Sequence, residues 1–599
     1  MDYAAIKNLP AMFFERAAQY GDRKFLWAKR DGAWTPLTWS ETASRVSALA
    51  SGLEGLGIAP GDRVGLVADN CPEWLIADVA IMAAGATTVP AYTTNTVDDH
   101  LHILSDSGAK AVIVSTATLA KHVLPAAAQS TETEIAITMA PVEHAPAQDL
   151  RVTAWDDVLA EGGNRADDVA ARTAEIPRSD TACIIYTSGT SGLPKGVMLS
   201  HGSIISNCMG AHEFLEMLPG FAVGAEVFLS FLPLSHSYEH TAGQFLPIAI
   251  GAQIYYAEGV DKLTGNMEEA TPTILTAVPR LYEAMHGRIT RGVEQTGGLK
   301  KTLFMKTVEL GRKRYEAGGM LGWWDSLVDG LLERLVREKV RARFGGRLKA
   351  FVSGGAPLNY DIGVFFQALG LRILQGYGQT EAAPVVSCNH PGLNKLATVG
   401  PPMKGVEVKI AGDGEILVRG ELVMRGYWND RQATAETIVD GWLHTGDIGV
   451  IDEDGYIQIT DRKKDIIVIS GGDNISPQRV EGMLTIEPEI AQAMVYGDTR
   501  PHLVALVVPD PEFALGWAKE NGKPEDMAAL AEDEEFGRVI RGAVDRVNEK
   551  LSNIERIRHF TMAPDGFTIE NEMLTPSMKI RRHIINQRFG DKLQALYGN

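Results

Sequence analysis

Short apolar runs alternate with longer amphipathic stretches along most of the chain. Apolar runs bounded by turn residues predict buried strands, and they lie at 64–68, 111–115, 182–186, 227–232, 273–278 and 350–353. Stretches with helical periodicity lie between them, as at 39–56 and 98–106. Such alternation is typical of α/β layers built on mostly parallel sheets. Ligands of these sheets bind beyond the carboxyl ends of the strands.

The pattern restarts after Asp461. Short strands are predicted at 466–470, 493–496 and 504–508, followed by late helices. A chain of 599 residues also exceeds what one hydrophobic core usually supports. We therefore predict a large N-terminal α/β domain, residues 1–461, and a small α+β domain, residues 462–599.

Composition narrows the class of protein. A hydrophobic share of 45% and a charged share of 22% are ordinary for a globular protein. The net charge of −19 argues against nucleic-acid binding. No apolar run can span a bilayer, since the best candidate, residues 74–89, contains Asp78. The N-terminus lacks the features of a secretion signal, and the four cysteines have no disulfide or metal spacing, so a cytoplasmic location is expected.

Residues 300–349 differ from the acidic remainder, with thirteen Lys or Arg against six Asp or Glu. Apolar residues within this region fall at helical spacing and predict an amphipathic helix: Trp324, Leu327, Val328, Leu331, Leu332, Leu335 and Val336. One interpretation is a helix that covers the core and exposes a solvated basic face. The other is peripheral contact with anionic membrane lipids or with the phosphates of CoA, in which Arg334, Arg337 and Arg341 would take part.

The most informative segment is Tyr186–Gly196, Y-T-S-G-T-S-G-L-P-K-G, directly after a predicted strand. Glycines allow the backbone to approach a phosphate closely, while hydroxyls and N–H groups supply donors. Lys195 adds a mobile positive charge suited to a polyphosphate. The segment differs from the common G-x-x-x-x-G-K-[ST] loop, because its lysine lies between Pro194 and Gly196. An ordinary flexible loop remains the alternative for this segment alone.

Three later segments add candidate chemistry. Gly376–Glu381, G-Y-G-Q-T-E, follows an apolar run and offers a flat ring, a hydroxyl and a carboxylate suited to Mg²⁺. Trp442–Asp447, W-L-H-T-G-D, places a carboxylate after a glycine, where it can hold a ribose diol. Asp461–Asp465, D-R-K-K-D, is a charged cluster before a strand, which taken alone is most often a solvated connector.

Together and in this order, the four segments resemble the AMP-forming acyl-CoA synthetase family, in the superfamily that includes firefly luciferase and peptide-synthetase adenylation domains. Within it the chain is most similar to long-chain fatty acid–CoA ligases, on the further segments Phe231–Glu239, Ser353–Leu358 and Thr575–Arg582. The resemblance covers about residues 9–587. It implies formation of acyl-AMP from a fatty acid and ATP with Mg²⁺, followed by transfer of the acyl group to CoA.

The resemblance also implies roles for particular residues. Phosphate binding would fall to Thr187, Ser188, Gly189, Thr190, Ser191, Gly192 and Lys195, and Mg²⁺ to Thr187 and Glu381. Adenine would contact Gly355, Ala356, Tyr377 and Gly378, the α-phosphate Thr380, and the ribose Asp447 and Arg462. His236 would position the carboxylate of the substrate; a histidine satisfied in the core is the plainer alternative.

In the C-terminal part, the resemblance makes Lys579 the lysine of the adenylation step, although a surface lysine beside Arg581 and Arg582 would look the same. Lys464 would be the hinge between two poses of a mobile domain, and Gly471 and Gly472 would approach the pantetheine arm of CoA. Ser577–Met578 departs from the Thr-Gly or Ser-Gly that many relatives carry before this lysine.

Three other functions stay open: an acyl-AMP ligase with a non-CoA acceptor, a silent nucleotide- or acyl-binding regulator, and luciferase-type oxidation. The sequence leaves both monomer and homodimer open.

Overall fold

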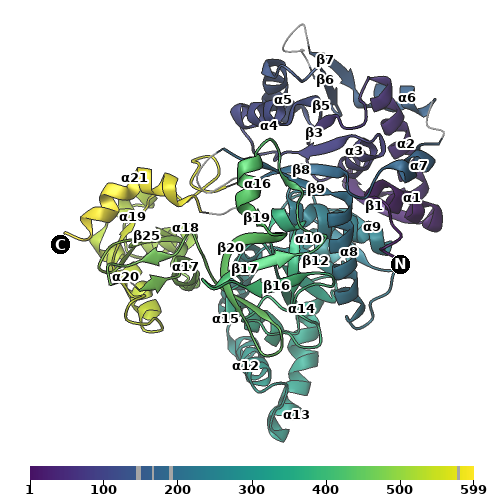
Figure 1. Cartoon of the computed structure of the whole chain (residues 1–599). Coiled ribbons are helices and arrows are strands. Elements are labelled where there is room, and N and C mark those ends of the chain that lie inside the picture. The colour runs from purple at the N-terminus through teal and green to yellow at the C-terminus, as the bar shows by residue number, and fades with distance from the viewer. Residues whose placement is uncertain (143–149, 165–167, 188–192, 472, 576–579, 599) are drawn as a thin grey trace.

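The computed structural model describes residues 1–142, 150–164, 168–187, 193–471, 473–575 and 580–598. Within them, two eight-stranded sheets and a smaller third sheet form the large N-terminal part, and a compact α+β unit follows it (Figure 1). The predicted fold class is confirmed. Apolar clusters within residues 3–457 are separate from those within residues 467–597. The boundary at residue 461 itself stays a prediction.

The first sheet has the strand order β15-β14-β13-β12-β10-β11-β1-β2. All its neighbours are parallel except for the edge pairs β1–β2 and β14–β15. Its strands are β1 (Lys24–Arg30), β2 (Ala33–Thr38), β10 (Val227–Ser230), β11 (Gln253–Tyr256), β12 (Ile274–Ala277), β13 (Ala350–Ser353), β14 (Ile373–Gly378) and β15 (Val385–Cys388).

The second sheet has the order β18-β9-β8-β4-β3-β5-β6-β7, with antiparallel pairing only along β18–β9–β8. Its strands are β3 (Arg63–Val67), β4 (Thr87–Pro90), β5 (Ala109–Val114), β6 (Ile135–Thr138), β7 (Arg151–Ala154), β8 (Thr181–Thr187), β9 (Lys195–Ser200) and β18 (Gly426–Tyr427). The third sheet, wholly antiparallel, contains β16 (Glu407–Ile410), β17 (Glu415–Arg419), β19 (Ile438–Val439), β20 (Trp442–Ile451) and β21 (Ile457–Arg462).

Helix α3 (Pro72–Ala83) lies inside the core shared by the first and second sheets. Eleven of its twelve residues are buried, which explains the nearly continuous apolar run of this segment. Its one buried carboxylate, Asp78, accepts a hydrogen bond from Gln244 at 2.7 Å and shares one with His240 at 2.9 Å. Buried polar groups with such partners are tolerated in a core, whereas unpaired ones are costly. Among the described residues, no helix is long and apolar enough to cross a bilayer.

Helices cover the sheets and begin where the sequence supplies caps. Thr38 and Glu41 form a capping box at α2 (Trp39–Gly55), as do Thr96 and Asp99 at α4 (Val97–Ser107). Other helices of this part are α1 (Leu9–Tyr20), α5 (Ala117–Gln129), α6 (Trp155–Gly163), α8 (His201–Glu216), α9 (Leu246–Ile250), α10 (Leu263–Ala270), α11 (Pro279–Thr296), α15 (Tyr360–Ala368) and α16 (Arg431–Thr437).

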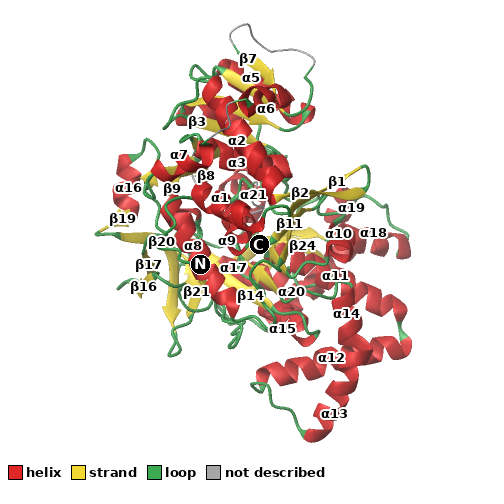
Figure 2. Ribbon diagram, turned by 90° about the vertical axis from the view of Figure 1, so that its right-hand side faces the viewer, coloured by secondary structure: helices red, strands yellow, loops and turns green. Residues whose placement is uncertain are grey.

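The basic region forms a helical extension at one end of the molecule (Figure 2). It consists of α12 (Gly298–Glu316), α13 (Trp323–Leu332), a π-helical turn (Glu333–Arg337) and α14 (Glu338–Ala342). The predicted helix exists, but the expected orientation is wrong. Trp324, Leu327 and Leu331 face solvent, whereas Arg337, expected to be available for contact with lipids or CoA phosphates, is fully buried.

In the C-terminal part, β24 (Ile490–Tyr496), β25 (Leu503–Pro509) and β26 (Ile557–Met562) form one sheet, and β22 (Ile467–Val468) with β23 (Asn474–Ile475) a second. Its helices are α17 (Pro477–Leu484), α18 (Pro511–Glu520), α19 (Met527–Ala531), α20 (Glu534–Asn548) and α21 (Arg582–Ala595). The short strands predicted after Asp461 correspond to β22, β24 and β25.

Candidate active site

The phosphate-loop segment joins two antiparallel strands. β8 ends at Thr187, and β9 begins at Lys195, directly opposite Thr187 in the ladder. Thr187 and Lys195 therefore stand side by side where the loop leaves the sheet. Ser188, Gly189, Thr190, Ser191 and Gly192 lie outside the described residues. The strand β9 was not predicted, because the glycines before it resemble the approach to a helix.

Lys195 has two partners that the sequence did not suggest. Its ammonium lies 3.0 Å from the carboxylate of Asp430 and 5.3 Å from the centre of the Tyr427 ring. Tyr427 ends β18, which pairs with β9 at the edge of the second sheet, and Asp430 follows three residues later. The N–H of Ala433 and the ammonium of Lys195 hold the pKa of Asp430 below its usual range. The aromatic and acidic residues of R-G-Y-W-N-D, 425–430, were the available signal in the sequence.

Tyr427 also connects Lys195 to the second motif. Its hydroxyl donates a hydrogen bond to Glu381 at 2.9 Å. Glu381 lies in a single 3₁₀ turn, Thr380–Ala382, directly after β14. Beside it, the hydroxyls of Thr380 and Ser237 are 3.0 Å apart. Glu381 and Tyr427 are 46 residues apart in sequence, and Thr380 and Ser237 are 143 apart, so the fold alone brings these side chains together.

At two positions of the predicted nucleotide site, the structure shows why glycine is needed. A Cβ at Gly378 would lie 1.8 Å from the carbonyl oxygen of Pro384, so no side chain fits there. Gly355 has φ +84°, a conformation that favours glycine. Gly355 and Ala356 follow β13 at the carboxyl edge of the first sheet, and both are exposed.

Asp447 connects the segment Gly376–Glu381 to the charged cluster Asp461–Asp465. Its carboxylate accepts hydrogen bonds from the Tyr377 hydroxyl at 2.6 Å and from Nε of Arg462 at 2.9 Å. Burial, together with the Asp447 charge, raises the pKa of Tyr377 well above its usual range. Asp447 lies within β20 and Arg462 ends β21, its antiparallel neighbour. The glycine turn expected before Asp447 is therefore a local kink within a strand, where Gly446 has φ +71°.

His236 follows β10 in a loop that the side chain of Asn70 fixes. Asn70 donates to the carbonyl of Leu232 at 2.6 Å and accepts from the N–H of Leu234 at 3.1 Å. The Nδ1 atom of His236 accepts a hydrogen bond from the N–H of Tyr238 at 3.1 Å. A neutral His236 ring must therefore carry its proton on Nε2.

The candidate residues of the C-terminal part are described only in part. Lys464 is exposed in the turn that follows β21, and Gly471 is exposed in a later turn. Gly472 and Lys579 lie outside the described residues. Near Lys579, Leu574 and Ile580 form an antiparallel bridge, and the Arg582 guanidinium makes two hydrogen bonds of 2.7 Å to Glu481.

The donor set near the phosphate loop is compatible with Mg²⁺. In the part of the chain that the structure describes, no three His, Cys, Asp or Glu side chains are grouped to hold a metal ion. Mg²⁺ usually takes one or two carboxylates and completes its shell with phosphate oxygens and water. Glu381 and the hydroxyl of Thr187 match that sparse kind of site. When bound, the ion would neutralise phosphate charge.

The segment Tyr377–Glu381 connects all these contacts, reaching Asp447 and Arg462 on one side and Tyr427 and Lys195 on the other. Thr187 and Lys195 at the base of the glycine-rich loop, the cluster of Asp447 with Tyr377 and Arg462, and a C-terminal α+β unit form the arrangement expected of an adenylate-forming enzyme. The chain belongs to the AMP-binding enzyme family. The family model "AMP-binding enzyme" matches residues 13–428, and "AMP-binding enzyme C-terminal domain" matches residues 464–599.

Curated relatives match over nearly the full length. A long-chain-fatty-acid–CoA ligase of Mycobacterium bovis is 35% identical over 98% of this chain and 97% of its own. The peroxisomal long chain acyl-CoA synthetase 7 of Arabidopsis thaliana is 31% identical over 100% of this chain and 87% of its own length. Among solved structures, the adenylation domain of a Mycobacterium chelonae carboxylate reductase superposes with a TM-score of 0.77 at 21% identity, over 99% of this chain and 91% of that one. That likeness shows the fold.

Proposed function

We propose that this protein activates a long-chain fatty acid with ATP to acyl-AMP and pyrophosphate, and then transfers the acyl group to the thiol of CoA. The observation that carries the proposal is the full-length similarity to curated long-chain ligases, at 35% and 31% identity. The candidate residues Lys195, Glu381, Asp447, Arg462 and Lys579 are all present in the sequence, which supports an active enzyme over a silent binder.

The chemistry explains why such residues are required. A carboxylate is a poor electrophile, and its oxygen is a poor leaving group for attack by a thiol. Attack of the carboxylate on the α-phosphate of ATP forms the acyl–phosphate bond and releases pyrophosphate. The thiolate of CoA then attacks the acyl carbon, and AMP leaves with the former carboxylate oxygen. The first step brings two negative groups together, so positive charge must be prearranged around them.

We assign the phosphates to the loop between Thr187 and Lys195 and the ribose to Asp447 and Arg462. Thr380, whose hydroxyl lies beside that of Ser237, is assigned to the α-phosphate. His236 is assigned to the substrate carboxylate, toward which its Nε2–H can donate. Lys579 would neutralise charge between the carboxylate and the α-phosphate in the transition state. Thioester formation would follow rotation about Lys464, which brings Gly471 and Gly472 toward CoA.

The decisive experiment measures pyrophosphate release from ATP and Mg²⁺ with acids from acetate to oleate, with and without CoA. Turnover that requires CoA and is fastest with long chains is expected. A single turnover without CoA and no stimulation by CoA would indicate a ligase with another acceptor, and no release with any acid would indicate a binding protein. Lys579→Ala is expected to abolish acyl-AMP formation and to retain thioester formation from supplied acyl-AMP. Loss of both half-reactions would contradict its assigned role.

A further inference from the structure

The extension formed by α12, α13 and α14 has an inverted amphipathic helix. An ordinary surface helix buries its apolar face and exposes its charged face. Asp325 and Asp329 of α13, and Glu333 of the π-helical turn that follows it, are instead buried or half-buried, and each pairs with a basic residue. Asp325 pairs with Lys313 at 2.5 Å, Asp329 with Arg314 at 2.8 Å and with Arg337 at 2.6 Å, and Glu333 with Arg341 at 2.5 Å.

The opposite side of the same helix is apolar and faces solvent. We call this surface the tryptophan stripe, and it consists of Trp323, Trp324, Leu327, Val328, Leu331 and Leu335. Trp323 and Trp324 are each 65% exposed, and their rings stack with centroids 3.9 Å apart. Contiguous exposed apolar surface of this kind usually marks an interaction site.

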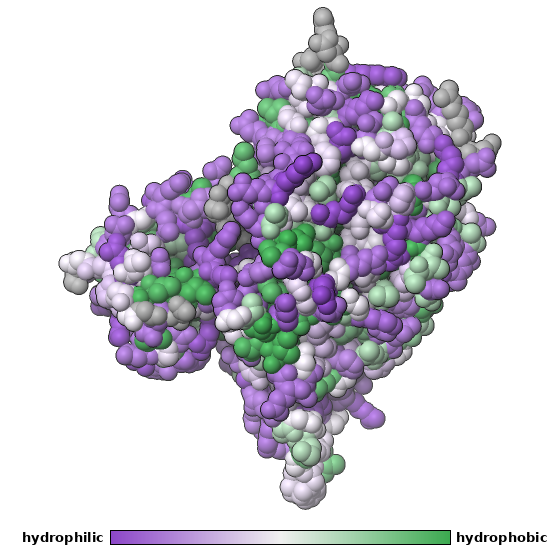
Figure 3. Space-filling view, viewed as in Figure 1, coloured by the Kyte–Doolittle hydropathy of each residue, from purple (hydrophilic) through white to green (hydrophobic). Residues whose placement is uncertain are grey.

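The stripe is held on a rigid base. Arg337 is fully buried, and its guanidinium donates to the carbonyl of Ala368 in α15 at 2.7 Å as well as to Asp329. On α12, Gly311 lies so close to Ala368 that a Cβ would be 2.4 Å from it. These contacts fix the extension to α15, in the part of the molecule that contains the first sheet. Helix α13 projects from the body of the molecule, and its tip shows pale and green atoms (Figure 3).

The exposed charges of residues 334–347, which overlap and follow the stripe in sequence, are mainly positive. Arg334, Lys339 and Arg343 are exposed, against the exposed carboxylate of Glu338. The whole chain carries −19, so this end is suited to approach a negatively charged surface. The same positive rim disfavours a second copy as the occupant, because two such rims would repel each other when the stripes meet.

We propose that the tryptophan stripe docks the protein on the surface of a lipid bilayer that contains anionic headgroups. Tryptophan side chains prefer the interface between headgroups and acyl chains, and basic residues beside them attract anionic lipids. The choice of a bilayer over another apolar partner rests on the proposed function, since long-chain fatty acids reside in membranes. The stripe geometry, the inward carboxylates and the positive rim do not depend on it.

Vesicle flotation of the full chain tests the proposal. The probes are vesicles of phosphatidylcholine and vesicles of an equal mixture of phosphatidylcholine and phosphatidylglycerol. The wild type is expected to bind the mixture more strongly. The pair Trp323→Ser and Trp324→Ser is expected to lose about tenfold or more in binding to it. The pair Arg334→Glu and Lys339→Glu is expected to lose the preference for phosphatidylglycerol, by about fivefold for each residue.

Val260→Ser with Leu393→Ser is the matched control, because both side chains are exposed and apolar but belong to other segments. Its binding should equal that of the wild type. Equal flotation of the tryptophan pair and the wild type would overturn the proposal, as would a wild type that binds neither vesicle. If the wild type binds no vesicles but forms a dimer, and the double variant Trp323→Ser with Trp324→Ser is a monomer, the stripe would be an interface with a second copy instead. Turnover of water-soluble acids, measured in parallel, tests the proposed function separately.

Discussion

Asp447 holds two donors from different strands, the Tyr377 hydroxyl and the Arg462 guanidinium. Asp447→Asn keeps the size of the side chain and removes its charge. We expect KM for ATP to rise roughly tenfold to a hundredfold, because hydrogen bonds to charged groups contribute about 1.5–3 kcal/mol. Initial rates and AMP calorimetry measure the change. Asp413→Asn, in an exposed pair with Lys463, is the control. An unchanged KM would remove Asp447 from the nucleotide site.

Glu239 is fully buried in the π-helical segment Glu239–Phe245, where its carboxylate accepts a hydrogen bond from Thr276 at 2.7 Å. Burial raises its pKa to about 7, so the folded state holds a proton that the unfolded chain releases near pH 4.5. The stability from this group is complete below pH 4.5 and is lost as the pH rises through about 7.

Glu239→Gln keeps the neutral form at every pH. Relative to wild type, it is therefore expected to gain roughly 3 kcal/mol in free energy of unfolding between pH 4.5 and 8. Urea unfolding across this range measures the difference. Glu316→Gln, at an exposed position, should follow the wild-type pH profile. Parallel profiles for Glu239→Gln and wild type would show that Glu239 is not the titrating group.

At the level of single residues, the sequence predicted those that lie in contiguous motifs. Tyr377, Thr380, Glu381 and Asp447 stand out because glycines and polar side chains interrupt apolar strands. Asp430 was not found, because its pairing with Lys195 depends on the docking of β18 against β9, more than two hundred residues apart in sequence. Nothing local in the sequence encodes that pairing.

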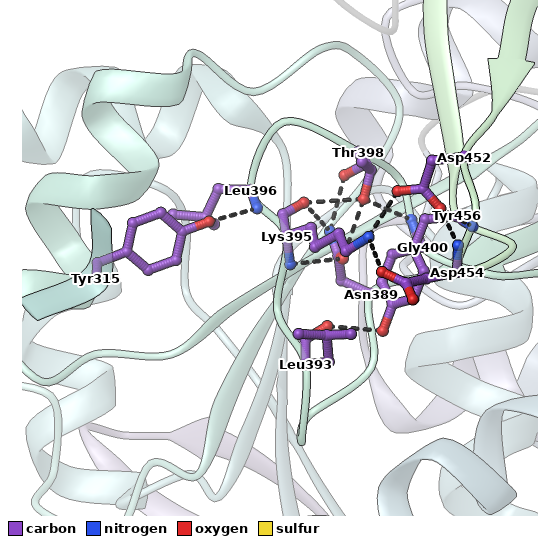
Figure 4. Close-up of polar contacts among 10 residues, drawn as sticks. All are labelled: Tyr315, Asn389, Leu393, Lys395, Leu396, Thr398, Gly400, Asp452, Asp454 and Tyr456. Carbon is purple, nitrogen blue, oxygen red and sulfur yellow. Dashed lines mark hydrogen bonds and ion pairs between the residues drawn. The ribbon is translucent and has the colours of Figure 1, made fainter. Parts of the chain in front are cut away.

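Among elements, the loop after β15 connects the extension to the third sheet (Figure 4). Tyr315 of α12 accepts a hydrogen bond from the N–H of Leu396 at 2.9 Å, and Lys395 pairs with Asp452 at 2.6 Å in the turn between β20 and β21. At the centre, the fully buried Asn389 donates to the carbonyls of Lys395 and Thr398 at 3.1 and 2.8 Å. This side chain organises the loop from within.

Asn389→Ala is expected to lower the free energy of unfolding of the N-terminal part by about 2–4 kcal/mol, since one buried and one half-buried carbonyl lose their donor. The first transition in urea unfolding measures this loss. Asn164→Ala, at an exposed position, is expected to change it by less than about 0.5 kcal/mol. Equal transitions for the two variants would mean that water replaces the Asn389 side chain.

Strands β3, β5, β8, β10, β12 and β13 were predicted because each contains a short apolar run between turns. Others were not: β1, for example, reads K-F-L-W-A-K-R and carries charges at both ends. β9 was missed because its glycine-rich approach resembles a loop before a helix. α13 was found, but its orientation was predicted wrongly. Periodicity shows that one face of a helix is apolar, whereas the ion pairs with α12 decide which face is buried.

For the whole molecule, the described residues of the two parts share few polar contacts. Arg280 of α11 donates to the carbonyl of Ala491 at 3.1 Å, Asn359 to that of Gly482 at 3.4 Å, and Arg291 pairs with Glu512 at 3.3 Å. Such sparse contacts favour movement of one part against the other. The turn at Lys464 is the connection through which that movement would pass.

Lys464→Pro is expected to slow thioester formation by roughly tenfold or more while ATP binding stays near the wild-type value, because proline fixes the backbone angle that a hinge must change. Single-turnover rates of the two half-reactions measure the effect. Lys464→Ala removes the side chain and leaves the backbone free, so it should retain both rates. Normal CoA-dependent turnover in the proline variant would place the hinge elsewhere.

On the role proposed for Lys195, its ion pair with Asp430 would make nucleotide binding an exchange of anions. The incoming polyphosphate would displace Asp430, and Asp430 would pair with the ammonium again as pyrophosphate departs. The Asp430 carboxylate would therefore weaken ATP binding and speed the release of pyrophosphate. Asp430→Asn retains the helix cap, which Asp430 forms by accepting from the N–H of Ala433 at 2.9 Å. It should bind ATP up to about fivefold more tightly and release pyrophosphate correspondingly more slowly in stopped-flow traces. Unchanged rates would mean that the polyphosphate does not replace Asp430 as the partner of Lys195.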